Sequence, residues 1–245
     1  MAEFSNCQVS KKYLITFLLL SITFNFFSYG ERSVEKLVDG IIWLSPPSLK
    51  GFLGVYKKNV IEGVEDTLKR DKSLSSEEIA SRLEKEMEEI KKIASSQPSF
   101  ETIAYKFGKS AGFVFLLDDP FREDSSEEVE KIKEDYYLYI ESRIDRLVLT
   151  FDGYDNPPFE KPISKYFDKR REVFKRYIDA VLFCYFPDGR MVSSKTFDDR
   201  SNAFGVAQII LSRSVSDAAK VWLELWKTMD GDLKDTPFLE KRISK

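Results

Sequence analysis

Residues 75–94, SSEEIASRLEKEMEEIKKIA, indicate the fold class most clearly. Ser75 is followed three residues later by Glu78, which is the spacing of a capping box at a helix N-terminus. The apolar residues that follow recur at spacings of three and four: Ile79, Leu83, Met87, Ile90 and Ala94. Because Glu and Lys fill the positions between them, the stretch predicts an amphipathic helix with one face turned toward a core.

The same periodicity extends along the rest of the chain. Ser125 and Glu128 form a second capping-box signal, ahead of a periodic stretch that ends near Ile144. The other helices are expected at residues 33–44, 48–60, 100–117, 163–186 and 204–226. Strand signals are weak, because residues 183–193 fit a small hairpin and a plain turn equally well.

These patterns predict one compact all-α domain of about seven helices, which extends from Glu31 to the last residue and becomes irregular after Asp230. The chain has 245 residues, of which 42% are hydrophobic, and this is enough for a sizeable core without disulfides or metals. An excess of Glu and Lys over Gln and Asn is typical of heat-adapted proteins, so a thermophilic source is expected.

The sequence contains no histidine, and this excludes several kinds of site at once. Neither a Ser-His-Asp triad nor an imidazole zinc site can form without that side chain. Only two cysteines are present, Cys7 and Cys184, too few for a four-sulfur zinc site. The net charge of −3 is spread evenly, so no nucleic-acid partner is expected.

Residues 13–29, YLITFLLLSITFNFFSY, form the one long apolar run. Lys11 and Lys12 precede the run, and the small residues Ser28 and Gly30 would suit a cut before Glu31. This layout is typical of a secretory signal peptide, so residues 1–30 are expected to direct export to a periplasmic or extracellular location. The alternatives are an uncleaved membrane anchor formed by residues 13–29 and a soluble first helix.

Residues 107–122, FGKSAGFVFLLDDPFR, resemble the central helix of the zinc-dependent phospholipase C and S1/P1 nuclease family, with its pattern L-G-x-x-x-H-x-x-x-D-x-x-x-P-x-H. Gly108 and Pro120 hold the separation of the glycine and proline in that pattern. The three zinc-ligand positions are replaced here by Gly112, Leu116 and Arg122.

Further stretches are similar to the same family. Tyr137 and Glu141 match its H-x-x-x-E motif, with tyrosine in place of the histidine, and Asp66 matches a ligand aspartate. The likeness covers most of residues 34–228 and implies an all-α domain built around a trinuclear zinc site for phosphoester hydrolysis. The family's N-terminal tryptophan ligand has no counterpart at Glu31, the predicted start of the mature chain.

The lost ligands imply a protein without a metal cofactor or catalytic residues, because two remaining carboxylates cannot assemble three zinc ions. We therefore expect an exported, non-catalytic binding or structural module. Its degenerate cleft would be lined at the positions that match the family: Asp66, Gly112, Leu116, Arg122, Tyr137 and Glu141. The resemblance also predicts that Arg122 pairs with Glu141 or Asp66 in place of the metal charge.

The expected ligand is a phosphate or a lipid headgroup held by Arg122. The alternative is a phosphoric diester hydrolase that uses a hard divalent metal on Asp66, Asp118, Asp119 and Glu141. Asp118-Asp119-Pro120 is also typical of a turn after a helix. The basic cluster at residues 169–176 fits a solvated helix face, with contact to a membrane surface as the alternative. The sequence does not define an oligomeric state.

Overall fold

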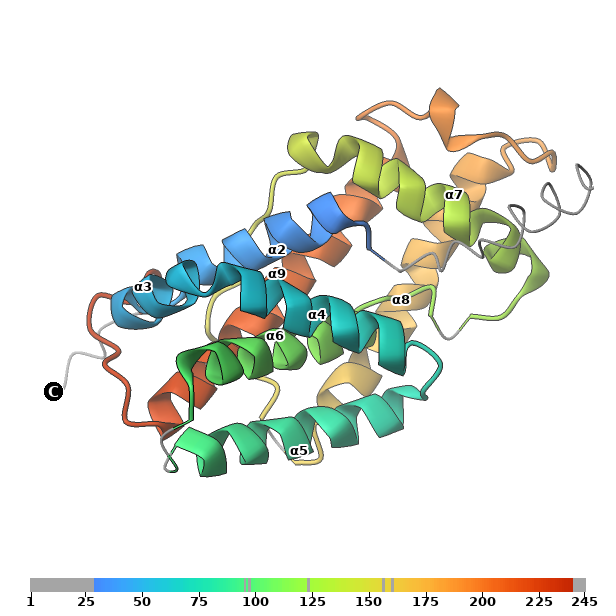
Figure 1. The fold of residues 1–245 in the computed structure, drawn as a ribbon. Coiled ribbons are helices and arrows are strands. Elements are labelled where there is room, and N and C mark those ends of the chain that lie inside the picture. Colours follow the sequence, from blue (N-terminus) through green and yellow to red (C-terminus); the bar gives the residue numbers. More distant parts are fainter. Residues whose placement is uncertain are drawn as a thin grey trace, which may run out of the picture.

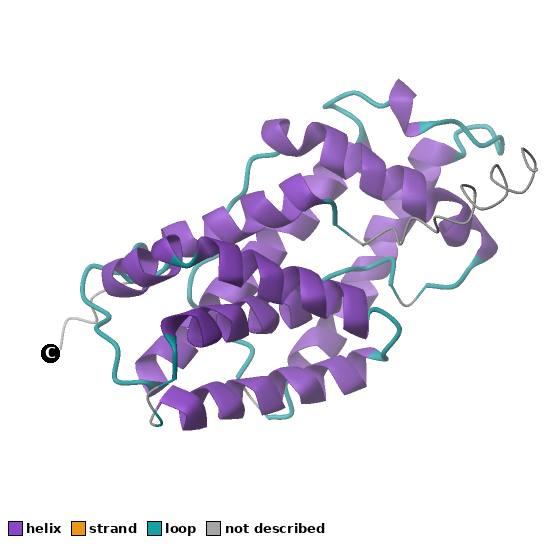
Figure 2. Cartoon of the chain, viewed as in Figure 1, coloured by secondary structure: helices purple, strands orange, loops and turns teal. Residues whose placement is uncertain are grey.

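The computed structural model describes residues 29–239 except 95, 97, 123, 156 and 160, and these residues form helices and loops without a strand (Figures 1 and 2). In chain order the α-helices are α2 (Glu31–Leu44), α3 (Pro47–Val55), α4 (Lys57–Asp71), α5 (Ser76–Ala94), α6 (Phe100–Leu117), α7 (Glu127–Arg143), α8 (Ser164–Tyr185) and α9 (Asn202–Thr228). Two short 3-10 helices are η1 (Ile144–Arg146) and η2 (Ser194–Thr196). The prediction of one compact all-α domain is therefore confirmed.

Helix α6 lies at the centre, packed against α4, α5 and α9 (Figure 1). Its last five residues, Phe113 to Leu117, are all apolar and all buried, as expected of a helix segment enclosed by others. Phe107 packs edge-on against Trp222 of α9, with ring centroids 5.8 Å apart. The indole of Trp222 also donates a hydrogen bond of 3.0 Å to the Phe107 carbonyl oxygen, so the buried indole N–H is paired.

Helices α4 and α6 approach each other closely because both carry glycine at their contact. A Cβ atom on Gly63 would lie 2.1 Å from the carbonyl oxygen of Tyr105. A Cβ atom on Gly108 would lie 2.0 Å from the carbonyl oxygen of Val60. Any side chain at these positions would force the two backbones apart, so Gly108 is required by helix packing.

The capping box at Ser75 is confirmed. The Ser75 N–H donates to the Glu78 carboxylate at 2.8 Å, and the Glu78 N–H donates to the Ser75 hydroxyl at 3.3 Å. The second predicted box is wrong by one residue, because Ser126 caps α7 and its hydroxyl accepts from the Val129 N–H at 3.4 Å.

The helix predicted over residues 48–60 is wrong in its bounds. The chain bends at Tyr56, so that α3 ends at Val55 and α4 continues to Asp71, a length that the apolar pattern did not indicate. The proposed hairpin is a turn: the N–H of Gly189 donates to the carbonyl oxygen of Phe186 at 3.2 Å, and Gly189 has a φ of +72°.

The predicted signal or anchor falls mostly on residues 1–28, which lie outside the described residues. Tyr29 and Gly30 are described, and both belong to the folded domain. Tyr29 is buried and packs edge-on against Phe115 at 6.0 Å, so a cut before Glu31 would remove an aromatic ring from the core. In the described part of the chain, no helix has both the length and the apolar character needed to cross a bilayer.

Candidate functional site

The connection between α6 and α7 contributes Asp119, Asp124 and other polar side chains to the lining of a surface cavity. It begins with Asp118, which ends α6, and continues through Asp119 and Pro120. The carboxylate of Asp119 accepts a bond of 3.0 Å from the Phe121 N–H, two residues on. Phe121 is fully buried and packs against Tyr136 at 5.0 Å. The predicted turn after this helix is therefore confirmed, and a buried ring fixes it in place.

Asp119 is held from the other side by Tyr137 of α7. The Tyr137 hydroxyl lies 2.8 and 2.7 Å from the two Asp119 carboxylate oxygens. Both side chains are largely buried, so the hydroxyl supplies a polar partner that an enclosed carboxylate needs. One predicted site position, Tyr137, thus fixes the orientation of the turn.

Behind the turn, Arg170 of α8 bridges two fully buried carboxylates. Its guanidinium lies 2.8 Å from Asp118 Oδ1 and also contacts Asp217 of α9. The Tyr166 hydroxyl donates to Asp217 at 2.9 Å, and the Lys220 ammonium lies 3.3 Å from the same carboxylate. The charges are therefore paired, which buried ions require.

Burial has the largest effect on the pKa of Asp118, and the nearby Asp217 carboxylate has the second largest. Together they raise the pKa of Asp118 to about 7, although Arg170 opposes the shift. Asp118 Oδ2 has no hydrogen-bond partner among the described residues. This oxygen would be left uncompensated if the group were ionised, so we expect Asp118 to hold a proton below neutral pH.

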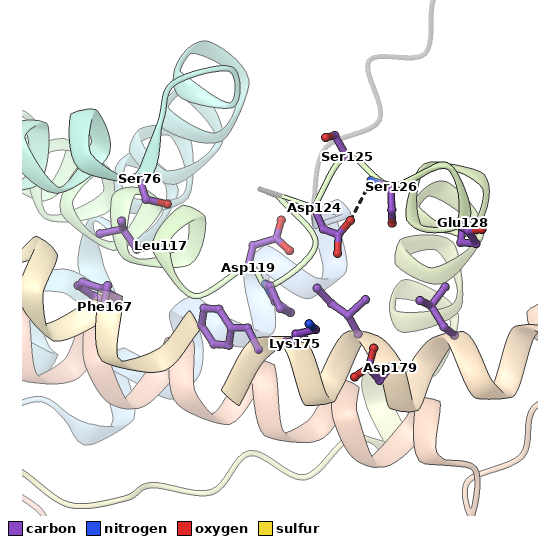
Figure 3. A pocket seen from close by; sticks show the side chains of 14 residues that line it. Ser76, Leu117, Asp119, Asp124, Ser125, Ser126, Glu128, Phe167, Lys175 and Asp179 are labelled. Atoms are coloured by element: carbon purple, nitrogen blue, oxygen red, sulfur yellow. Dashed lines mark hydrogen bonds between the residues drawn. The ribbon is translucent and has the colours of Figure 1, made fainter. Parts of the chain in front are cut away.

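A groove of about 710 Å³ lies between this connection and α8 (Figure 3). Its floor is formed by apolar side chains, mainly of α8: Leu117, Phe167, Phe174, Ile178 and Leu182. Its rim is polar and carries Ser76, Asp119, Asp124, Ser125, Ser126, Glu128, Lys175 and Asp179. In Figure 3, Asp119 and Asp124 stand on the connection while Lys175 and Asp179 stand on α8.

The rim of the groove is acidic. Its described charged groups are four carboxylates and one ammonium, that of Lys175. Hydrogen bonds from Ser126, one of them from its N–H at 2.9 Å, lower the pKa of Asp124, and the charges of Lys133 and Lys175 add to that effect. Asp124 is therefore ionised at neutral pH and contributes a negative charge to the rim.

A second cavity, of about 320 Å³, is also bordered by Asp119. It is lined by Lys72, Asp119, Arg122, Glu130, Lys133, Glu134 and Tyr137. The structure therefore brings together two of the six predicted cleft residues, Arg122 and Tyr137. The Arg122 guanidinium donates to the Ser76 hydroxyl at 3.2 Å.

The remaining four predicted positions have separate structural roles. Leu116 is 1% exposed and belongs to the core, and Gly112 faces Thr67 so closely that a Cβ atom would lie 2.7 Å from the Thr67 Cβ. Asp66 accepts a bond of 2.8 Å from the Tyr105 hydroxyl.

Glu141 accepts hydrogen bonds from the backbone N–H groups of Arg32 and Ser33, at 2.9 and 3.0 Å. Its carboxylate thus caps α2, where the helix dipole favours a negative charge. The predicted ion pair of Arg122 with Glu141 or Asp66 is wrong, since neither pair occurs among the ion pairs of the described residues.

The carboxylates considered for a hard metal ion also have separate partners. Asp66 binds Tyr105, Asp118 binds Arg170, Asp119 binds Tyr137 and Glu141 caps α2. Within the part of the chain that the structure describes, no three Asp, Glu or Cys side chains are grouped so that they could hold a metal ion.

The groove and the Arg170 network were not predicted from the sequence. Arg170 lies in the basic cluster at 169–176, for which the sequence predicts a solvated helix face. Its side chain is nevertheless only 15% exposed. Asp217 and Lys220 stand three residues apart on a helix whose neighbouring positions are apolar. Because charged residues are rarely buried unless they are paired, this spacing was the one feature of the sequence that could have indicated a buried ion pair.

The fold and the groove define an all-helical protein with an amphipathic surface cavity. Comparisons with family models, curated proteins and solved structures give no match to this chain.

Proposed function

We propose that this chain is an exported, non-catalytic binding protein, a divergent relative of the phospholipase C and P1 nuclease family, which holds a small cationic amphiphile in the groove beside α8. The observation that carries the binding proposal is the groove itself. Its volume of about 710 Å³ is typical of small-molecule sites, and its lining combines an apolar floor with a few polar groups.

The floor suits a hydrocarbon chain or an aromatic ring. Phe167, Phe174 and Ile178 present carbon to the cavity, and Leu182 extends the same helix face. Burying apolar surface of a ligand there would contribute about 25 cal/mol per Å². A wholly charged molecule such as free phosphate gains nothing from this floor, so the ligand should be amphipathic.

The charged groups on the rim of the groove determine which charge the polar end of the ligand should carry. Asp124, Glu128 and Asp179 stand around the opening, while Lys175 is the one cation among the described lining residues. Asp119 is already bonded by Tyr137, so the three outer carboxylates are the groups placed to meet a ligand. An amine or quaternary ammonium group fits this charge pattern better than an anion does.

The non-catalytic part of the proposal draws on how the positions that resemble zinc ligands are used. Glu141 caps a helix, Leu116 fills the core and Tyr137 orients the turn. The metal-dependent phosphodiesterase alternative gains no support from this arrangement. We expect purified protein to leave bis(p-nitrophenyl) phosphate uncleaved with Mg²⁺, Mn²⁺ or Zn²⁺; cleavage that is lost in Glu141→Gln would contradict the non-catalytic assignment.

Calorimetric titration with octyltrimethylammonium, compared with octyl sulfate, tests the ligand class. We expect saturable binding of the cation and a several-fold weaker affinity in Asp179→Asn, because one attractive charge is lost. Asp188→Asn removes an exposed aspartate in the turn after α8 and serves as the matched control. Tighter binding of octyl sulfate, or an equal effect of the two variants, would overturn the proposal.

A second candidate is the expected phosphate or lipid headgroup, held in the cavity beside Arg122. The observation that favours it is that Arg122, Lys72 and Lys133 line one cavity. Because a guanidinium can bind phosphate through two N–H groups, Arg122→Gln should abolish binding of glycerol 3-phosphate while Arg200→Gln leaves it intact. Equal heats for both variants would remove this candidate.

A further inference from the structure

Asp118 stands between two residues that line the groove. Its neighbours in the chain, Leu117 and Asp119, both face the cavity, while Asp118 itself is buried (Figure 3). On the opposite wall, Arg170 of α8 follows three residues after Phe167, which forms part of the floor. Because residues three apart lie on the same side of a helix, the bond of 2.8 Å between Arg170 and Asp118 joins the two walls of the groove.

Asp118 and Asp217 are the two buried carboxylates that share Arg170. Asp217 also accepts from the Tyr166 hydroxyl at 2.9 Å and from the Lys220 ammonium at 3.3 Å, so its negative charge is compensated. Asp118 accepts from Arg170 through Oδ1, whereas its Oδ2 has no hydrogen-bond partner among the described residues. When the two carboxylates share one proton, the proton therefore resides on Asp118.

This proton is the change of charge to expect behind the groove near neutral pH. The chain has no histidine, the side chain whose ordinary pKa lies between pH 5 and 8, whereas burial and Asp217 raise the pKa of Asp118 to about 7. Arginine keeps its charge throughout, and burial raises the pKa of the Tyr29 and Tyr166 hydroxyls, so both stay neutral. The charged and titratable groups that face Asp118 come from four parts of the fold: Tyr29 ahead of α2, Asp119 with its partner Tyr137 of α7, Tyr166 and Arg170 of α8, and Arg213 and Asp217 of α9.

We propose that Asp118 makes the groove sensitive to protons: a cationic ligand binds more tightly once Asp118 has lost its proton, and binding of the cation in turn expels that proton. Loss of the proton adds one negative charge behind a rim that is already acidic. It also turns the contact with Arg170 into a charge-assisted bond between the two walls. Because binding linkage is reciprocal, ionisation strengthens binding by the same factor by which binding weakens the hold of Asp118 on its proton.

The inference rests on the proposed binding of a cationic amphiphile, so calorimetric titration with octyltrimethylammonium at pH 6, 7 and 8 tests it. The charge of this probe does not depend on pH. We expect the wild type to bind the probe about two- to fivefold more tightly at pH 8 than at pH 6. At pH 7, titrations in phosphate and in Tris, which differ in their heat of ionisation, should show release of about 0.2–0.5 proton per ligand bound.

Asp118→Asn keeps the shape of the side chain but cannot ionise, so it should bind with one affinity at all three pH values and release no proton. Asp188→Asn, at an exposed turn after α8, should retain the wild-type behaviour. Saturable binding to the wild type without pH dependence or proton release would overturn the inference and leave the proposed ligand in place. Proton release that persists in Asp118→Asn would assign it to another group and would also overturn the inference. No binding at any pH would overturn both the inference and the proposed function.

Discussion

Asp118→Asn tests whether the buried carboxylate beside Arg170 carries a proton. Asp118 is 1% exposed, and its pKa is raised to about 7 from an ordinary value of 3.8. Burial raises it most and Asp217 raises it further, while Arg170 lowers it. The asparagine side chain has nearly the same shape, and its oxygen can still accept from Arg170, but it cannot ionise.

The direction in which stability changes with pH follows from proton linkage. Between about pH 4 and pH 7 the folded chain keeps the Asp118 proton while the unfolded chain releases it, so the free energy of unfolding falls as the pH rises. Each pKa unit corresponds to about 1.4 kcal/mol, so the shift sets an upper limit of about 4 kcal/mol on the stability lost across this window. The stability is fully present below about pH 4 and is lost above about pH 7.

Urea unfolding followed by circular dichroism at pH 5, 6, 7 and 8 measures this effect. We expect the wild type to lose stability between pH 5 and 8 and Asp118→Asn to lose less, so that the variant becomes the more stable protein at pH 8. Asp188→Asn, at an exposed turn, should follow the wild type. Parallel profiles for wild type and Asp118→Asn would show that the carboxylate is ionised throughout, and the argument from burial would then be wrong.

Three further predictions concern single contacts. Gly108→Ala should destabilise the fold by about 3 kcal/mol or more in urea unfolding, because the added Cβ would meet a backbone carbonyl of α4. Gly205→Ala, with open space around it, should be neutral or stabilising. Similar losses of stability in the two variants would contradict the close contact of α4 and α6. Glu141→Ala should lower the free energy of unfolding by about 1–3 kcal/mol, because α2 loses its cap. Glu130→Ala, at an exposed position, should stay within about 0.5 kcal/mol of the wild type. Equal losses in the two variants would refute the role of Glu141 as a cap. Tyr137→Phe should cost about 1–3 kcal/mol, because it leaves the buried Asp119 carboxylate without its hydroxyl partner, and a neutral result in the same assay would contradict that role.

The helices were predictable where amphipathic periodicity and a cap coincide. Helix α5 shows this, since Ser75 and Glu78 mark its start and its apolar residues follow at helical spacing. The break at Tyr56 was not predictable, because residues on both sides of it are compatible with one helix. Only the tertiary fit of α3 and α4 distinguishes the two arrangements.

The site was less predictable than the fold, because it depends on residues far apart in the chain. Arg170 and Asp118 are 52 residues apart, and neither belongs to a sequence motif that indicates a buried ion pair. Glu141 was expected to face Arg122 but caps α2, a contact across more than 100 residues. The resemblance to a metalloenzyme family pointed to Asp66, Tyr137 and Glu141, but the partners of these side chains depend on helix packing that local spacing does not encode.

Amide NMR of the full chain titrated with octyltrimethylammonium tests the central claim most directly, because it locates the ligand as well as detecting it. We predict that the signals that shift belong to residues 117–128 and 167–182, which border the groove. Shifts confined to another part of the fold, or no shift at all, would contradict the assignment of this groove as the binding site.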